Sequence, residues 1–311
     1  MRQLLFKFIL VILVITCSCN SSQKINKEVL NSKDFNFFVL GDWGRDGKFY
    51  QKDVAEQMIV QAKKYDPAFI MLTGDNFYDD GVANTADKHW KASYENIYKE
   101  LTKNYQWLVC LGNHDYRGSV QAQIDYHLIN KNWILPSRYY TKVVETKDHQ
   151  KVRLICIDTS PYYSEYYSLK TMTAVKMQDT ALQRKWIDST LAASKEPWKI
   201  VFGHHPVYSA AKRGGTPELV KMLEPMLEKY HVQAYICGHD HNLQHTHSPK
   251  GDVDYFISGG GSEVKDSPVF TKSNFAESKA GFADVTIKAD SLFINYIDKD
   301  GNVLYKFGRG K

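Results

Sequence analysis

Short apolar runs recur along the chain, and most of them have the length of a buried strand. Seven such runs combine β-branched, aromatic and other apolar side chains over three to six residues, which is typical of strands inside a sheet. They are Phe35–Leu40, Ala68–Leu72, Trp107–Leu111, Val152–Ile157, Trp198–Phe202, Gln233–Cys237 and Tyr255–Ile257. Helical patterns lie between several of these runs. Strands that alternate with helices predict an α/β sheet architecture.

Four segments between the predicted strands have the pattern of amphipathic helices. The apolar stripes of the first three are Val54, Met58, Ile59 and Ala62, then Trp90, Tyr94, Ile97, Tyr98 and Leu101, then Leu182, Trp186, Thr190 and Leu191. The fourth helix is predicted to begin at Thr216-Pro217-Glu218. Threonine is a good N-cap, proline suits the first helical turn, and an acid is favourable at the positive end of the helix dipole.

The C-terminal part of the chain has a different pattern. Residues 282–287, 292–297 and 303–307 predict antiparallel strands, and Asp300-Gly301 predicts a turn between the last two. The sequence contains no internal repeat and no low-complexity linker. We therefore expect one domain over residues 35–311.

The N-terminal segment has the layout of an export signal rather than of a folded element. Arg2 and Lys7 precede the apolar run Phe8–Ile15, which is short for a membrane span. We expect residues 1–19 to be the signal and residues 20–34 to be a short tether.

Two cysteines at the end of this segment are candidates for lipid attachment. Cys19 follows small residues, as in the cleavage and lipidation site of bacterial lipoproteins, and Cys17 is an alternative acceptor. A plain cleaved signal peptide is the other interpretation. Either interpretation predicts an exported protein, which would be periplasmic, an outer-membrane lipoprotein with a lipid tether, or secreted.

The composition excludes several classes of protein. With 311 residues, 43% hydrophobic and 24% charged, the chain is too apolar for a disordered protein or a coiled coil. The net charge of +5 is modest, and the sequence has no stripe of basic residues, so we expect no nucleic-acid partner. The other cysteines, Cys110, Cys156 and Cys237, lie in predicted strands and are expected to be buried free thiols. We also expect a monomer.

Five polar motifs, each led by a glycine, directly follow five of the predicted strands. They are Gly41-Asp42-Trp43-Gly44, Gly74-Asp75-Asn76-Phe77-Tyr78, Gly112-Asn113-His114-Asp115, Gly203-His204-His205-Pro206 and Gly238-His239-Asp240-His241. Ligands of open α/β sheets bind at the carboxyl ends of strands. We therefore expect the five motifs to converge on one site.

The side chains of these motifs have the chemistry of metal ligands. The candidates are Asp42, Asp75, Tyr78, Asn113, His204, His239 and His241. Carboxylates and imidazoles together suit Fe, Zn or Mn. Seven candidates exceed what a single centre uses. Two metal ions about 3.5–4 Å apart, bridged by one carboxylate, account for the number better.

The ordered set of motifs resembles the metallophosphoesterases of the purple acid phosphatase family, and most closely its small tartrate-resistant branch. Gly81-Val82 and Gly281-Phe282-Ala283 also stand as that branch has them, and the resemblance extends from about Phe35 to the C-terminus. It implies the calcineurin-like phosphoesterase fold. That fold is a four-layer α/β/β/α sandwich of two mixed sheets flanked by helices.

The resemblance also implies a role for each candidate ligand. A ferric ion would be bound by Asp42, Tyr78 and His241, a divalent Fe, Zn or Mn ion by Asn113, His204 and His239, and both ions by Asp75. Tyr78 is the discriminating residue, because a phenolate is a good ligand for Fe(III); the alternative is an aromatic residue over the site. The implied activity is an exported acid phosphatase that hydrolyses phosphomonoesters with a metal-bound hydroxide as nucleophile.

Two further residues are expected to face the substrate. The resemblance places His114 outside the ligand set, where it contacts phosphate and protonates the leaving oxygen. Arg213 stands nine residues after His204, where mammalian-like members have a second substrate-side histidine. Arginine can bind phosphate but cannot supply a proton. The alternative for Arg213 is a solvated basic loop.

Two other functions are compatible with the same motifs. One is a phosphodiesterase with a di-manganese or di-zinc centre on the same scaffold. The other is a non-catalytic metal-binding surface protein anchored through Cys19. Such a protein would be expected to lack a ligand or His114, and neither is missing.

Overall fold

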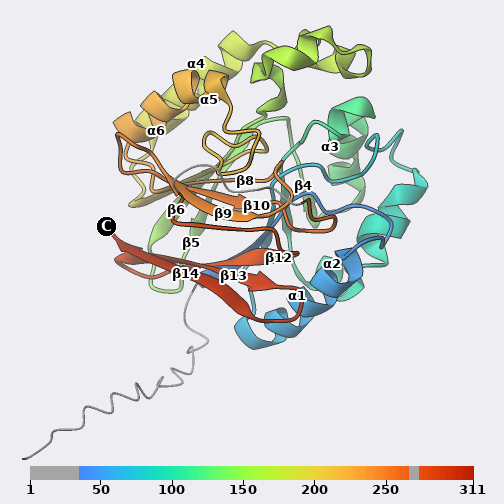
Figure 1. Ribbon diagram of the computed structural model, residues 1–311, viewed down its shortest axis with the longest axis horizontal. Helices are drawn as coiled ribbons and strands as arrows, with labels where there is room; N and C mark the ends of the chain where they lie inside the picture. Colours follow the sequence, from blue (N-terminus) through green and yellow to red (C-terminus); the bar gives the residue numbers. More distant parts are fainter. Residues whose placement is uncertain (1–34, 266–272) are drawn as a thin grey trace, which may run out of the picture. The chain divides into compact units, whose positions relative to one another are not determined.

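Two seven-stranded mixed sheets lie against one another, with helices on their outer faces (Figure 1). The computed structural model describes residues 35–265 and 273–311. The predicted α/β/β/α sandwich is therefore confirmed. The predictions for residues 1–34, namely the signal, the tether and lipidation at Cys19 or Cys17, lie outside the described residues.

The first sheet has the strand order β14-β13-β12-β1-β2-β3-β4. Its strands are β1 (Phe35–Leu40), β2 (Ile70–Leu72), β3 (Trp107–Val109), β4 (Trp133–Ile134), β12 (Gly281–Ile287), β13 (Ser291–Asp298) and β14 (Val303–Gly310). Strands β1 to β4 run parallel, whereas β12, β13 and β14 pair antiparallel, β12 directly with β1. The predicted antiparallel C-terminal strands are confirmed, and they extend the sheet that β1 begins.

The second sheet has the order β11-β9-β10-β8-β7-β6-β5. Its strands are β5 (Tyr140–Glu145), β6 (Lys151–Cys156), β7 (Trp198–Phe202), β8 (Ala234–Cys237), β9 (Leu243–His247), β10 (Asp254–Ser258) and β11 (Phe275–Glu277). The apolar runs had predicted β6, β7, β8 and β10, which form its parallel centre. Strand β9 was missed because it is polar, yet it is almost wholly buried between β10 and β11.

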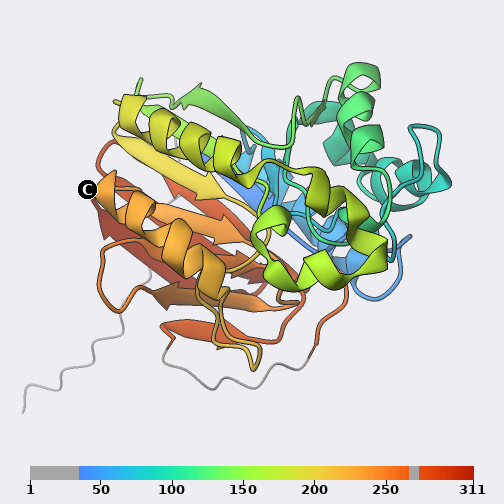
Figure 2. The same cartoon turned by 90° about the horizontal axis from the view of Figure 1, so that it is seen from above.

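Helices cover the outer faces of both sheets (Figures 1 and 2). Those at the first sheet are α1 (Gln51–Tyr65), α2 (Lys99–Asn104) and α3 (Val120–Ile129), and those over the second are α4 (Thr180–Ala193), α5 (Pro217–Met222) and α6 (Glu224–Lys229). The stripe that starts at Trp90 is buried as predicted, but it begins as a π-helical turn, Trp90–Glu95, before α2. Helix α3 was not predicted. Among the described residues, no helix has the length and apolar character needed to cross a membrane.

Helix α4 exists as predicted, but its buried face is different. Leu182 is 56% exposed, and the inward residues are Gln183, Ile187 and Leu191. The Gln183 side chain accepts a hydrogen bond from the Asp158 backbone N–H (2.8 Å) and donates one to the Asp158 carbonyl (3.1 Å). A polar residue takes the inner position because it satisfies a buried peptide group, which a hydrophobic side chain could not do.

Aromatic residues of the first sheet's layer support the loops at the strand ends. Trp43, directly after Asp42, packs edge-on against Tyr98 at 5.4 Å between ring centroids and donates its indole N–H to the Asn76 side-chain oxygen at 3.3 Å. The first two motifs are thus joined through a buried tryptophan. Cys110, Cys156 and Cys237 are buried free thiols, as predicted.

Replacement of Gln183 by alanine tests which face of α4 is buried. We expect Gln183→Ala to lower the free energy of unfolding by about 1–3 kcal/mol, because it leaves the buried Asp158 N–H and C=O without partners. Urea unfolding measures this difference. Leu182→Ala is the matched control and should change stability by less than about 0.5 kcal/mol. A larger loss for Leu182→Ala than for Gln183→Ala would contradict the assigned face.

Candidate metal centre

Loops from both sheets meet at one site, as the sequence predicts. Strands β1, β2 and β3 of the first sheet and β7 and β8 of the second each end just before one of the five motifs. The structure brings together all seven candidate ligands: Asp42, Asp75, Tyr78, Asn113, His204, His239 and His241. All of them are buried.

One corner of the site is centred on the hydroxyl of Tyr78. This oxygen lies 2.9 Å from a carboxylate oxygen of Asp42, 2.9 Å from one of Asp75 and 3.0 Å from Nε2 of His241. A phenol has one proton to donate, so it can donate to only one of the two carboxylates. Ligand atoms bound to one cation at about 2.0–2.2 Å are about 3 Å apart. The spacing of these four groups is that of a ligand set.

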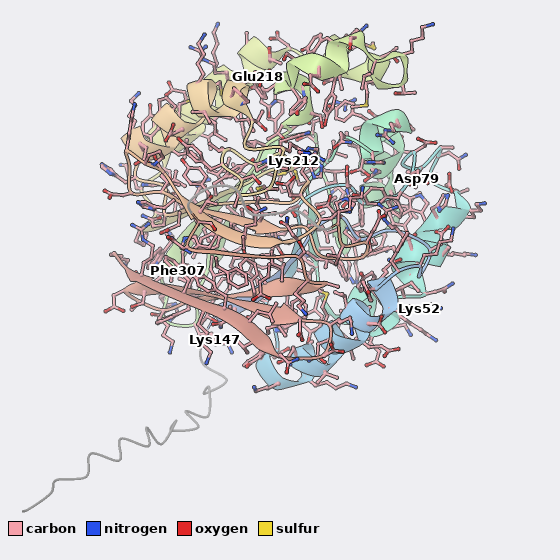
Figure 3. All side chains as sticks on the ribbon, viewed as in Figure 1. Lys52, Asp79, Lys147, Lys212, Glu218 and Phe307 are labelled. Atoms are coloured by element: carbon pink, nitrogen blue, oxygen red, sulfur yellow. The ribbon has the colours of Figure 1, made fainter. Side chains whose placement is uncertain are left out.

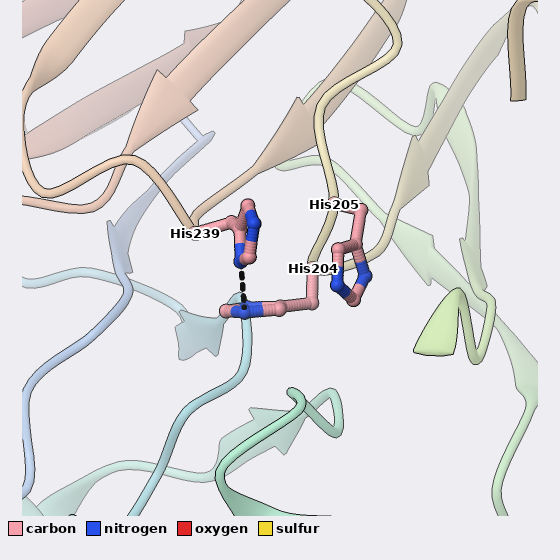
Figure 4. Close-up of side chains that lie close together, drawn as sticks. All are labelled: His204, His205 and His239. Carbon is pink, nitrogen blue, oxygen red and sulfur yellow. Dashed lines mark hydrogen bonds between the residues drawn. The ribbon is translucent and has the colours of Figure 1, made fainter. Parts of the chain in front are cut away.

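The other corner joins Asn113 with two histidines. The Asn113 side-chain oxygen lies 3.1 Å from Nε2 of His204 and 3.0 Å from Nδ1 of His239, and the two nitrogens are 3.1 Å apart (Figure 4). Nδ1 of His204 lies 2.9 Å from the Thr73 carbonyl oxygen, so the ring donates its Nδ1–H there and directs Nε2 to Asn113 and His239. Two imidazole nitrogens and one amide oxygen, all of them atoms that can bind a metal ion, thus converge on a second point.

Asp75 lies between the two corners. Its Oδ2 contacts the Tyr78 hydroxyl, while its Oδ1 is 3.4 Å from Nε2 of His204 and accepts the His114 backbone N–H at 2.8 Å. One carboxylate therefore reaches both groups of ligand atoms. This is the arrangement that a pair of bridged cations requires.

Unusual backbone conformations direct these side chains inward. Asp42, Asp75 and His239 have φ values of 58°, 50° and 71°, in the left-handed region that side-chain-bearing residues seldom occupy. Such residues are concentrated at functional sites. Gly112 allows the loops to approach, because a Cβ atom there would lie 2.2 Å from the Asp75 backbone nitrogen.

The electrostatics of the site follow from its burial. Burial raises the pKa of Asp42 to about 7 and that of Tyr78 well above its ordinary value. Burial would also raise the pKa of Asp75 and lower that of His204. Their mutual attraction outweighs burial, so the pKa of Asp75 falls well below its usual range and that of His204 rises to about 9. Burial lowers the pKa of His241 to about 3, which keeps its imidazole neutral and available to a cation.

A buried carboxylate next to the ligands locks two of the loops together. Asp115 accepts hydrogen bonds from the backbone N–H groups of Gly112 (2.8 Å) and Asn76 (3.0 Å) and from the Gln123 side chain (2.8 Å). Burial raises its pKa to about 7. No role is predicted for Asp115 from the sequence, although its place in the third motif is a signal for one.

His205 is a second residue whose role the sequence did not reveal. Its ring lies beside that of His239, with 4.4 Å between centroids (Figure 4). Its Nδ1 is 2.8 Å from the Thr159 hydroxyl and its Nε2 is 2.8 Å from the Tyr166 hydroxyl. Although its nitrogens lie near those of His204 and His239, both are already hydrogen-bonded. His205 therefore supports the wall of the site rather than adding a ligand.

An open cavity of about 450 Å³ lies over the ligands. Its lining includes Asp75, Asn113, His114, Arg117, Tyr163, Glu165, Tyr166, Arg213, His239, His241 and Lys265. Both residues predicted to face the substrate, His114 and Arg213, therefore lie in its wall. A larger groove of about 1050 Å³ runs along α4, α5 and α6, but the candidate ligands are not part of its lining.

His114 and Arg213 are held differently at this cavity. Nδ1 of His114 is 2.5 Å from the Asp79 carbonyl oxygen, and its ring packs on Tyr78 at 4.3 Å between centroids. Burial lowers the pKa of His114. Arg213 is half exposed, contacts Nε2 of His239 and lies 3.7 Å from the Asp240 carboxylate.

The donor set fits a dinuclear metal centre. Two groups of oxygen and nitrogen atoms, each with ligand spacing, share the carboxylate of Asp75. Nδ1 of His241, buried on the side away from Tyr78, has no hydrogen-bond partner among the described residues. Cations at the two points would take the place of the protons that Tyr78 and His204 carry.

Comparisons with known proteins agree with this geometry. The family model described as calcineurin-like phosphoesterase matches residues 35–243. "Purple acid phosphatase 7" of Arabidopsis thaliana is 35% identical over 287 residues, which cover 89% of this chain and 86% of that protein. "Tartrate-resistant acid phosphatase type 5" of Homo sapiens is 32% identical over 292 residues, covering 87% and 89%. The solved structure described as "GAP50 the anchor in the inner membrane complex of Plasmodium" is 26% identical, with a TM-score of 0.77 and 89% of both chains covered.

Cation uptake should release protons from the site. At pH 6 the phenol of Tyr78, the imidazole of His204 and most of the Asp42 carboxyl are protonated, and each must lose a proton to become a ligand. We expect about two to three protons to be released per chain. Calorimetric titration of the metal-free protein with ferric and zinc ions, in buffers of different ionisation enthalpy, measures this number.

Two tyrosine variants sharpen the measurement. Tyr78→Phe should release about one proton fewer. Tyr140→Phe, which removes a buried hydroxyl that donates to the Val109 carbonyl, should behave as the wild type. Heats that do not depend on the buffer would contradict the proposed ligand set.

Proposed function

The chain belongs to the calcineurin-like phosphoesterase family, within its purple acid phosphatase branch, and we propose on this basis that it is an exported acid phosphatase. It hydrolyses small phosphomonoesters at a dinuclear centre of Fe(III) and a divalent Fe, Zn or Mn ion. The observation that carries this proposal is the close approach of the Tyr78 hydroxyl to Asp42, Asp75 and His241. A buried phenolate beside two carboxylates needs a strongly charged cation, and a ferric ion meets that need.

Each corner of the site is assigned one ion. Fe(III) would be bound by Asp42, Tyr78 and His241, the divalent ion by Asn113, His204 and His239, and both by Asp75. When bound, the pair supplies Lewis-acid activation of the attacking water and of the phosphoryl oxygens. The protein holds the ligands at fixed spacing. The Thr73 carbonyl accepts a hydrogen bond from Nδ1 of His204, and the His239 backbone N–H donates one to Asp42 at 2.8 Å.

His114 is the proposed proton donor. Its Nδ1–H donates to the Asp79 carbonyl, and its Nε2 lies 3.9 Å from a carboxylate oxygen of Asp75, in a side chain that lines the cavity. A protonated Nε2 can give its proton to the leaving oxygen of the ester. Because burial lowers the pKa of His114, the protonated form is populated at acidic pH and is lost as the pH rises.

Arg213 is the proposed phosphate-binding residue. It contacts Nε2 of His239, whose opposite nitrogen, Nδ1, faces Asn113 and His204. When Nδ1 is a ligand, Nε2 carries the proton and cannot accept from a guanidinium. The Arg213 fork is then free to bind phosphate oxygens across the cavity.

Export rests on the N-terminal sequence alone. The basic start, the apolar run and Cys19, with Cys17 as the alternative, support a periplasmic or outer-membrane lipoprotein or a secreted form. We propose a monomer without a nucleic-acid partner.

Two alternatives are retained as outcomes of the tests. A phosphodiesterase on the same scaffold would prefer a bis-ester and carry no ferric ion. The other alternative is a non-catalytic surface protein. It is retained because a similar solved structure, from Plasmodium, is described as an anchor. That alternative would bind metal but show no hydrolysis.

Metal content and colour test the proposed centre. We expect two metal ions per chain, at least one of them iron, and a visible absorption band from charge transfer between the Tyr78 phenolate and Fe(III). Tyr78→Phe should remove the band and leave the protein folded. Tyr140→Phe is the control and should keep it. One ion per chain, or a band that survives in Tyr78→Phe, would refute the centre.

Hydrolysis of matched substrates separates the three functions. The proposal predicts a kcat/KM for 4-nitrophenyl phosphate that exceeds that for bis(4-nitrophenyl) phosphate by about tenfold or more. A reversed preference would favour the phosphodiesterase, and no turnover by metal-loaded protein would favour the non-catalytic protein.

Replacement of His114 tests proton donation. His114→Ala should lower kcat by about 10²–10³ on glycerol phosphate, whose alkoxide leaves poorly without a proton. The loss should be much smaller on 4-nitrophenyl phosphate, because nitrophenolate leaves without protonation. Steady-state kinetics at pH 5 measure both values. Equal losses on the two substrates would show that His114 does not donate the proton.

A further inference from the structure

Arg45 stacks on the ring of the tyrosine that occupies one corner of the site. The centre of its guanidinium lies 3.6 Å from the Tyr78 ring centroid, and its side chain is only 10% exposed. The backbone N–H of Arg45 donates at 3.0 Å to the buried side chain of Gln51, at the start of α1. The same Gln51 oxygen accepts the Gly47 N–H at 2.7 Å. The loop that carries Arg45 is therefore anchored, and the stacking is built into it.

Glu263 joins this cation to a second proposed iron ligand. Its Oε2 lies 2.7 Å from a terminal nitrogen of Arg45 and 3.8 Å from Nδ1 of His241. Nδ1 of His241 has no hydrogen-bond partner among the described residues. Histidines that bind metals usually donate their other ring N–H to a carboxylate or carbonyl, which fixes the ring. Glu263 is the carboxylate placed to accept from His241.

The other charges near this pair are solvated and compete weakly. Asp79 lies 3.4 Å from Arg45, but its side chain is 78% exposed and stands at the surface (Figure 3). Lys265 lies 3.8 Å from Glu263 and is 58% exposed. Exposed ion pairs are worth little because water screens them. The close contacts of Arg45 are with Glu263 and with the ring of Tyr78, and Glu263 also faces the buried Nδ1 of His241.

We propose that Arg45 and Glu263 are positioning residues that tune the iron side of the centre: Arg45 weakens electron donation by Tyr78, and Glu263 orients His241. This inference rests on the proposed function, since it needs a tyrosine bound to iron. A cation over the face of an aromatic ring stabilises negative charge in that ring. Electrons held in this way need more energy to transfer to Fe(III). The planar guanidinium suits the stacked position better than an ammonium does.

The experiment compares the iron-loaded wild type with Arg45→Gln, Arg45→Lys, Glu263→Gln and the control Arg153→Gln. Arg153 also forms a partly buried ion pair, with Glu196 at 2.7 Å, and its hydrogen bonds and ion pairs involve no residue of the site. Arg45→Gln should shift the visible band to longer wavelength by on the order of 10 nm. Arg45→Lys should not restore the wild-type position, because it lacks the flat stack.

Glu263→Gln is read by iron retention instead of colour. We expect Fe(III) to be lost to a chelator about 10–100-fold more readily than from the wild type, because His241 loses its charged acceptor. Arg153→Gln should match the wild type in both the band and the release of iron. Thermal unfolding of each variant establishes that it is folded. Should Arg45→Gln not fold, Arg45→Lys and Glu263→Gln still decide the outcome.

The two possible failures are distinguishable. A wild type with no band, or with a band that Tyr78→Phe leaves unchanged, would overturn the proposed ferric site and this inference with it. A wild-type band that depends on Tyr78, together with unchanged band position and iron release in the Arg45 and Glu263 variants, would overturn the inference alone.

Discussion

The crowding of seven buried side chains that can bind metal ions is the constraint on which the site depends. The Tyr78 hydroxyl lies within 3.0 Å of two carboxylates and an imidazole, and Asn113, His204 and His239 converge on a second point. Without cations, protons compensate this crowding. Burial raises the pKa of Asp42 to about 7, and the attraction of Asp75 raises that of His204 to about 9. Cations would displace these protons, so metal binding and proton release are coupled at this site.

The two-sheet fold is what makes such crowding possible. Each ligand loop leaves the end of a buried strand, and the loops are tied to one another rather than to solvent. Asp115 joins the second and third motifs, Trp43 joins the first to the second, and the Thr159 hydroxyl accepts the backbone N–H groups of both His204 and His205. These contacts offset the conformational free energy of the unusual backbone angles at Asp42, Asp75 and His239. The ligand geometry is therefore established by folding and not by the metal alone.

Sequence reasoning predicted the parts of this structure that local pattern determines. Buried parallel strands read as apolar runs, and motifs at their ends implied a shared site, so the resemblance to purple acid phosphatases and the sandwich fold are both confirmed. The misses have a common cause. The missed features are polar and buried: strand β9, the inward Gln183 of α4, Asp115 and His205. Each is stabilised in the interior by a partner that is distant in the sequence. The spacing of apolar residues along the chain does not predict such partners, and a single sequence does not identify contacts between distant residues.

The substrate side of the cavity is less symmetric than its metal side. His114 and Arg213 lie in the wall of one cavity, but only the imidazole can lose a proton at physiological pH, whereas the guanidinium stays charged. In the proposed mechanism, with arginine in place of a second histidine, binding of the phosphate and protonation of the leaving group would fall to different residues. Binding would then change little with pH. The loss of turnover as the pH rises would follow the deprotonation of His114, whose ring is held by the Asp79 carbonyl and whose pKa is lowered by burial.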